Sequence, residues 1–150
     1  MAKTKLRLDD FLPFRLSVAS NAVSRLIARA YETRFGLKVA EWRLIAVLAE
    51  TEGLTQQAIV ERTVMDKVTV SRAVQGLMER RLATREPNPR DARSHLVSLT
   101  KEGLALHAEV APIALNTERK LLEGLTPDEV KELERLLIWV ERKSDELARG

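Results

Sequence analysis

The stretch from residue 55 to residue 99 constrains the fold most, because two capped helices and a hairpin must fit into it. Thr55 is a typical N-cap for a helix extending to about residue 62, and Asp66 is a second N-cap for a helix extending to about residue 81. The turn between them spans only residues 63–65. The segments 82–85 and 96–99 then alternate apolar and polar residues, as two paired antiparallel strands do. The stretch therefore predicts a helix–turn–helix unit followed by a hairpin, which is typical of proteins that place a helix against DNA.

The first forty residues predict a long helix with one apolar seam. Its apolar positions are four and three residues apart, a repeat of two per heptad, and they comprise Leu12, Leu16, Ala19, Val23, Leu26 and Ala30. We expect this helix to start after Asp10, to run to about residue 35 and to be closed by Gly36. Such a seam is typical of a helix that lies along another helix, so it predicts a partner outside its own small core.

Three more helices are expected, over residues 41–50, 101–123 and 127–147. Thr100 caps the second, and Pro112 is expected to kink or split it. Thr126 caps the third, with Pro127 in its first turn and Glu129 completing a capping box. The third carries a second apolar stripe, formed by Val130, Leu133, Leu137 and Val140. The predicted fold class is therefore mainly α with a small β-hairpin.

Composition excludes several classes of protein. The 150 residues suit one domain, and a hydrophobic fraction of 45% allows a real core. The chain has no cysteine, which excludes disulfides, iron–sulfur clusters and thiol chemistry, and its two histidines offer no ligand-spaced metal site. The N-terminal residues show no signal-peptide pattern, and the longest purely apolar stretch spans only residues 44–49. We expect a soluble, cytoplasmic protein without cofactor, metal or membrane partner.

Positive charge is concentrated on one segment. The net charge is +3, yet residues 62–101 hold nine basic and four acidic side chains, so the rest of the chain is slightly acidic. Such a concentration is typical of a surface that binds a polyanion. An ordinary solvated surface would give the same count, so charge alone leaves both interpretations open.

The second helix of the helix–turn–helix unit carries residues suited to reading DNA. Val70, Val74 and Leu77 share one face and are expected in the core. The remaining surface near the helix start offers Lys67, Val68, Thr69, Ser71, Arg72 and Gln75. Arginine can pair with guanine, glutamine with adenine, and valine or threonine can contact a thymine methyl group. Thr55 and Gln57, which begin the preceding helix, are added as expected DNA contacts. The alternative is a plain amphipathic helix with a solvated outer face.

The hairpin favours the DNA-binding interpretation. Arg90 and Arg93 lie at its tip with Asp91 between them, and Ser94 follows. A basic loop held beside a recognition helix can enter an adjacent minor groove. Asp91 is then expected to fix the direction of an arginine. The alternative is a polar turn in which Asp91 and Arg93 simply pair with each other.

Residues 54–103, LTQQAIVERTVMDKVTVSRAVQGLMERRLATREPNPRDARSHLVSLTKEG, resemble the MarR family of bacterial transcriptional regulators. The D-x-R-S at residues 91–94 matches the wing motif of that family, and LTKEG at residues 99–103 matches the usual entry to the next helix. The resemblance implies a single domain over residues 1–150, with a winged helix-turn-helix core at 36–103 and dimerisation helices at 9–35 and 101–148. Arg81 stands where many members have glycine.

The resemblance also implies a function. A homodimer would bind a pseudo-palindromic operator in double-stranded DNA, and a small ligand, often aromatic and anionic, would release it. Arg15 is the best candidate for holding a ligand carboxylate, and Trp42 and His107 are candidate pocket walls. Each has a plainer alternative: Arg15 can pair with an acid across the dimer, Trp42 can belong to the core, and His107 can be a surface residue.

Two rival classes remain. Residues 98–101 match the S-x-x-K nucleophile motif, but they fall at a strand end without companion motifs, and H-E-x-x-H, Walker and G-x-G-x-x-G patterns are absent. We therefore expect no enzyme. The second rival is a helical homodimeric interaction module that does not bind DNA, which would leave the arginine-tipped hairpin without a reason.

Overall fold

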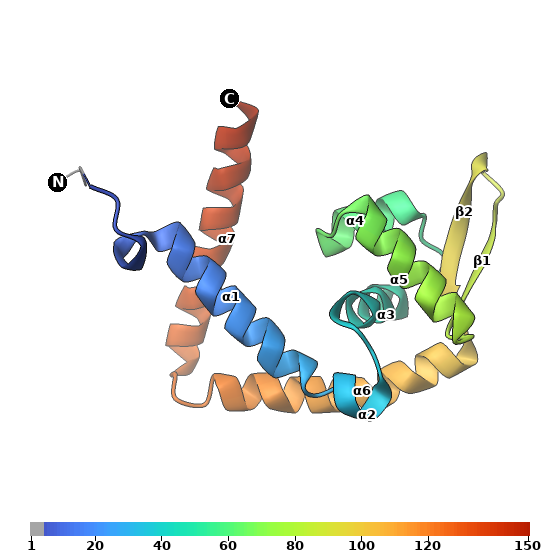
Figure 1. Cartoon of the computed structure of the whole chain (residues 1–150), viewed down its shortest axis with the longest axis horizontal. Helices are drawn as coiled ribbons and strands as arrows, with labels where there is room; N and C mark the ends of the chain where they lie inside the picture. Colours follow the sequence, from blue (N-terminus) through green and yellow to red (C-terminus); the bar gives the residue numbers. More distant parts are fainter. Residues whose placement is uncertain (1–4) are drawn as a thin grey trace. The chain divides into compact units, whose positions relative to one another are not determined.

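The computed structural model describes residues 5–150, which form nine helices and strands after a short 3-10 turn at Leu8–Asp10 (Figure 1). In chain order these are α1 (Leu12–Ala28), α2 (Glu32–Phe35), α3 (Val39–Glu50), α4 (Gln56–Thr63), α5 (Lys67–Glu79), β1 (Ala83–Asn88), β2 (Asp91–Leu99), α6 (Lys101–Leu121) and α7 (Pro127–Arg149). The chain divides into two compact units, one up to Ala114 and one over Leu115–Gly150. The predicted class, mainly α with a small β-hairpin, is confirmed.

The predicted end of the first helix is wrong. Helix α1 stops at Ala28, and the separate short helix α2 follows. Between them Tyr31 leaves helical geometry, with φ −128° and ψ −20°, and its side chain is only 2% exposed. Burial of this large ring favours a break that a local pattern cannot show. Gly36 does end α2 as expected, in the left-handed conformation with φ 64°.

The core of the first unit is built from the helices of the helix–turn–helix region and the helix before them. Leu44 and Ile45 of α3 meet Ile59 of α4, and the predicted inner face of α5 is buried. Each such side chain contributes about 1.5–3 kcal/mol on burial. The remaining buried members include Val70, Val74, Leu77, Leu82, Val97 and Val110. This core sets the position of α5 relative to α3 and α4.

The predicted helix caps are present. Thr55 Oγ1 accepts the backbone N–H of Ala58 at 3.1 Å, and Thr100 Oγ1 accepts that of Gly103 at 3.0 Å. Thr126 exchanges bonds with Glu129, forming the expected capping box. Caps depend on residues three positions apart, which is why sequence alone locates them.

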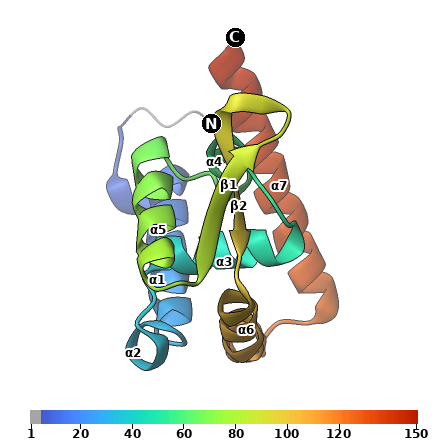
Figure 2. The ribbon, with the colours of Figure 1, turned by 90° about the vertical axis from the view of Figure 1, so that its right-hand side faces the viewer.

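The two strands pair antiparallel, with Ala83 opposite Leu99, and extend further toward the tip than predicted. The hairpin returns alongside α5, so its tip lies toward the end of the unit where α5 begins (Figure 2). Leu54 pairs with Val97 in an isolated bridge: the Leu54 N–H donates to the Val97 carbonyl at 3.0 Å, and the Val97 N–H donates back at 2.7 Å. The bridge joins the segment just before α4 to the base of β2.

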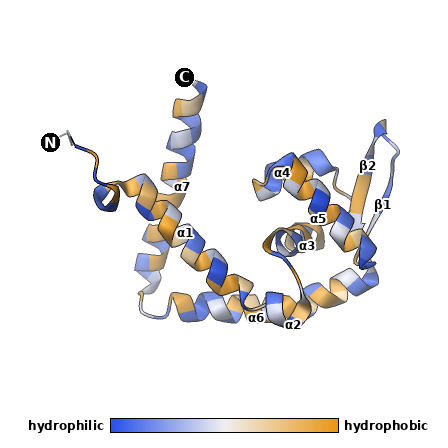
Figure 3. Cartoon of the chain, in the orientation of Figure 1, coloured by the Kyte–Doolittle hydropathy of each residue, from blue (hydrophilic) through white to orange (hydrophobic). Residues whose placement is uncertain are grey.

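Helix α6 continues through Pro112, so the predicted split is absent. Figure 3 shows hydrophobic residues recurring among hydrophilic ones along α1 and α7. On α7 these side chains are largely exposed, with Leu133, Leu137 and Trp139 at 43%, 47% and 57%. Among residues 5–150 no helix is both long enough and apolar enough to cross a bilayer.

Candidate nucleic-acid interface

Helix α5 presents a polar face at its N-terminal end. Asp66 caps the helix by accepting the backbone N–H of Thr69 at 2.7 Å and its hydroxyl at 2.9 Å. The bond from the Thr69 backbone lowers the pKa of the Asp66 carboxyl, and the hydroxyl bond adds to this effect. Thr69 is half-buried, and its two bonds to Asp66 hold it in the cap. The other DNA contacts expected on this helix are exposed: Lys67, Val68, Ser71, Arg72 and Gln75.

The two expected contacts on α4 already make local bonds. Thr55 is half-buried and uses its hydroxyl oxygen as the helix cap. Gln57 is exposed, and its side-chain amide donates to Glu61 Oε1 at 3.2 Å. Both residues lie at the start of α4 and line one depression together with Lys67, the first residue of α5, and Arg93 of the hairpin.

The hairpin tip is ordered by side chains that bond to the backbone. Asn88 Oδ1 accepts the N–H of Arg90, and Asp91 Oδ1 accepts the N–H of Arg93, both at 3.0 Å. The Asn88 side-chain amide also donates to Ser94 Oγ at 3.0 Å. Asp91 thus fixes the backbone at Arg93, and within residues 5–150 it forms no ion pair with an arginine. Both arginine side chains remain exposed.

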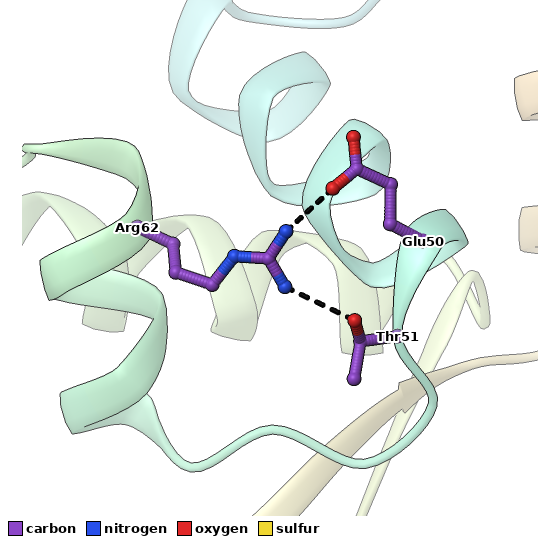
Figure 4. A network of polar contacts seen from close by, with 3 residues as sticks. All are labelled: Glu50, Thr51 and Arg62. Carbon is purple, nitrogen blue, oxygen red and sulfur yellow. Dashed lines mark hydrogen bonds and ion pairs between the residues drawn. The ribbon is translucent and has the colours of Figure 1, made fainter.

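Two of the nine basic residues in the segment 62–101 use their side chains to hold helices together. Arg62 joins α4 to the end of α3, with one guanidinium nitrogen on Glu50 and the other on Thr51 at 3.0 Å (Figure 4). Arg80 donates to the carbonyls of Phe35 at 2.9 Å and Gly36 at 3.1 Å, which ties the end of α5 to the end of α2. Neither side chain is free to bind a polyanion without losing these bonds.

The free positive charge lies around the hairpin and the start of α5. Five exposed cations there form no ion pair with any described residue: Lys67, Arg72, Arg85, Arg90 and Arg93. A depression of about 330 Å³ separates the hairpin from the helix starts and is lined by Thr55, Gln56, Gln57, Lys67, Arg85, Arg93, Ser94 and His95. Gln56, Arg85 and His95 were not expected from the sequence. The alternation of β2 would have indicated His95, because His95 shares a face with Arg93 and with buried Val97.

The three candidate ligand residues are only partly brought together. Trp42 of α3 stacks on His107 of α6, with ring centroids 5.7 Å apart and an interplanar angle of 17°. Tyr31 extends the group at 5.8 Å from Trp42, and its burial raises the pKa of its hydroxyl. Arg15 is exposed on α1, and no hydrogen bond, ion pair or ring contact joins it to these rings. Tyr31 carried no sequence signal because its burial depends on the break after α1.

Two capped helices joined by a short turn, followed by a basic hairpin that returns alongside the second helix, define a winged helix-turn-helix protein. Comparison with known proteins gives the family. The model of the MarR family matches residues 35–94. A crystal structure of a probable transcriptional regulator from Pseudomonas aeruginosa is 32% identical, covers 89% of this chain and 99% of its own, and superposes with a TM-score of 0.79. The chain belongs to the MarR family and is a transcriptional regulator.

Other relatives agree with this assignment. The MarR/EmrR family regulator from Acinetobacter sp. ADP1 is 28% identical, covers 94% of this chain and 99% of its own, and has a TM-score of 0.85. The transcriptional regulator HosA of Escherichia coli O111:H- is 29% identical over 89 residues, which are 59% of this chain and 66% of HosA. The chain thus matches just under two thirds of the length of HosA. These relatives are regulators of transcription, not enzymes.

Proposed function

We propose that the protein is a homodimeric repressor that binds a pseudo-palindromic operator. Helix α5 enters the major groove with Lys67 and Arg72 foremost, and the hairpin reaches the neighbouring groove with Arg90 and Arg93. The observation that carries this proposal is the group of exposed cations at the start of α5 and on the hairpin, none of which pairs with an acid within residues 5–150. The full set of proposed contacts is Thr55, Gln57, Lys67, Val68, Thr69, Ser71, Arg72, Gln75, Arg90, Asp91, Arg93 and Ser94.

Dimerisation is supported by apolar faces that lack a partner within their own unit. On α1, Leu12, Val18 and Val23 are 63%, 39% and 38% exposed, and α7 exposes a longer row of leucines. A monomer rarely leaves such rows in water, because burying them in an interface is favourable. We assign residues 9–35 and 101–148 to dimerisation and residues 36–103 to DNA binding. A two-fold dimer then presents two recognition helices about 10 base pairs apart.

The repressor and ligand parts of the proposal draw on relatives. The transcriptional repressor IacR of Pseudomonas putida is 24% identical over 136 residues. The structure of BpsR from Bordetella bronchiseptica, 23% identical with a TM-score of 0.84, concerns regulation of DNA binding by 6-hydroxynicotinic acid. We propose a small aromatic anion for this chain too, held against Trp42 and His107 with Arg15 binding its carboxylate. Such a ligand acts only if it binds the DNA-free form better. A regulator of this kind works in the cytoplasm, where its DNA lies.

The test is a binding titration on a duplex taken from upstream of the gene for this chain. Arg72→Ala should weaken binding by one to two orders of magnitude and relax base preference, because an arginine–guanine pair discriminates by about 1–3 kcal/mol. Arg93→Ala should weaken binding as well. Arg43→Ala is the matched control, because it removes an exposed charge from α3 of the same unit. Intact dimers that bind no duplex would instead indicate an interaction module.

A further inference from the structure

The inner face of the hairpin changes from apolar to basic along its length. Residues opposite each other in an antiparallel pair share a face, and every second residue continues it. At the base this face holds Ala83 and Val97, which are 4% and 0% exposed. On the same face Arg85 of β1 lies opposite Val97, and His95 of β2 lies two positions closer to the tip than Val97; both side chains are exposed. The face that packs on the core is therefore continued by cationic and imidazole groups.

The bridge between Leu54 and Val97 places this basic stretch beside the start of α4. The two backbone bonds, at 3.0 and 2.7 Å, hold Leu54 against Val97 of β2, two residues after His95 on the same strand. Thr55 then caps α4 directly after the bridge. The hairpin base and the first turn of α4 are consequently fixed to each other by backbone contacts, which makes the space between them a built feature of the fold.

Three of the eight side chains that line that space are cationic, four are uncharged polar groups and one is an imidazole. The depression of about 330 Å³ is lined by Lys67 from α5, Arg85 from β1, and Arg93 and His95 from β2, and no acidic side chain lines it. None of the three cations, Lys67, Arg85 and Arg93, forms an ion pair with a described residue. Like charges gathered without a counter-charge repel one another. An anion placed among them would relieve this repulsion and accept several hydrogen bonds.

We propose that this depression, the phosphate notch, binds one phosphate of the DNA backbone through Arg85 and His95, with Lys67 contributing charge. The inference rests on the proposed DNA binding and adds two contacts that the recognition helix and the hairpin tip do not supply. Arg85 donates through its guanidinium, and His95 donates through a ring N–H. A phosphate contact carries no base information, so the notch anchors the base of the hairpin on any sequence.

The experiment measures affinity for two duplexes, one from upstream of the gene and one of scrambled sequence, over a series of salt concentrations. Arg85→Ala should weaken binding to both about tenfold, as expected for loss of a charged hydrogen bond. It should also reduce the slope of log affinity against log salt by about one, because one fewer counterion is released. His95→Ala should weaken both several-fold, and His95→Gln, which keeps a donor, should restore most of the loss. Arg43→Ala again serves as the control.

A second arm identifies the phosphate. Single neutral methylphosphonates replace the phosphates of one strand, one position at a time. At one position the replacement should lower the affinity of the wild-type protein and leave the affinity of Arg85→Ala unchanged. If the wild-type protein binds neither duplex, the proposed function fails. If it binds normally but Arg85→Ala and His95→Ala keep its affinity and salt slope, the phosphate notch alone is wrong. Loss confined to the upstream duplex would also overturn it, because that result indicates base recognition. Thermal melting of each variant shows that it is folded.

Discussion

The carboxylate of Glu41 occupies the place where a side chain on Gly76 would lie. Glu41 is 7% exposed, and its Oε1 accepts the backbone N–H of Lys38 at 2.9 Å, which begins α3. A Cβ built on Gly76 would stand 2.6 Å from the other oxygen, Oε2. The recognition helix thus passes over the start of α3 at the one point where it has no side chain, and the two helices are fixed relative to each other.

This relationship predicts a reversal of sign in a double-mutant cycle. Gly76→Ala should destabilise the wild-type protein by about 1 kcal/mol, because overpacking by 1–3 kcal/mol exceeds the gain in helix propensity. In a Glu41→Ala background the obstacle is gone, and the same change should stabilise by up to about 1 kcal/mol. Urea unfolding of the four proteins measures both values. An equal effect in both backgrounds would show that the two residues are not coupled.

Arg81 is predicted to be a site of backbone strain. It adopts a left-handed conformation with φ 60°, and its carbonyl accepts the Thr100 hydroxyl at 2.8 Å, which requires the conformation to be kept. Arg81→Gly should raise the free energy of unfolding by about 1 kcal/mol, because glycine adopts this region without a steric cost. Arg80→Gly is the control and should lower it, since Arg80 holds two carbonyls of α2. Chemical denaturation measures both, and a loss of stability in Arg81→Gly would contradict the account.

The cap of α5 should make stability depend on acid pH. The pKa of Asp66 is lowered by the bond from the Thr69 backbone, so the folded state favours the carboxylate. Its contribution is present above the unfolded pKa, near the ordinary value of 3.8, and is lost as the pH falls through the lower folded pKa. Asp66→Ala should melt a few degrees lower at neutral pH. The difference from wild type should shrink below about pH 4, as calorimetry across pH would show. Asp66→Asn, which keeps an acceptor, should melt close to wild type.

Tyr31 should ionise late. Burial raises the pKa of its hydroxyl above 10.0, and Glu32 raises it further. Its contribution to stability is therefore complete below pH 10 and is lost as the pH rises through the folded pKa. Because it is the only tyrosine in the chain, the ultraviolet absorbance of tyrosinate reports it directly. Tyrosinate should form at a higher pH in the folded protein than in the urea-unfolded chain, and coincident titration curves would contradict the burial of Tyr31.

Features set by neighbouring residues could be predicted from the sequence. The caps at Thr55, Asp66 and Thr126 depend on contacts three residues away, and the inner face of α5 follows from its spacing. Features set by distant residues could not. Arg80 donates to carbonyls 44 and 45 positions away, at the end of α2. A count of charges along the sequence includes Arg80 in the basic segment and cannot show these bonds.

The candidate site shows the same division. The exposed residues of α5 and the basic hairpin tip were predicted because each lies on one periodic element. The phosphate notch was missed because it combines Lys67, Arg85 and His95 from three elements, which line one depression only in the folded chain. Asp91 was expected to orient an arginine side chain, whereas it binds the backbone of Arg93, since a carboxylate at a tight turn reaches the N–H two residues on more readily.

In the proposed complex, two copies of the chain place α5 and the hairpin on successive turns of one duplex. Hydroxyl-radical footprinting of the wild-type protein on the DNA upstream of its gene tests this directly. We expect two protected regions related by a two-fold axis, with centres about one helical turn apart. Arg72→Ala should weaken both, and Arg43→Ala should leave both unchanged. A single protected region without symmetry, or protection that Arg72→Ala leaves intact, would contradict it.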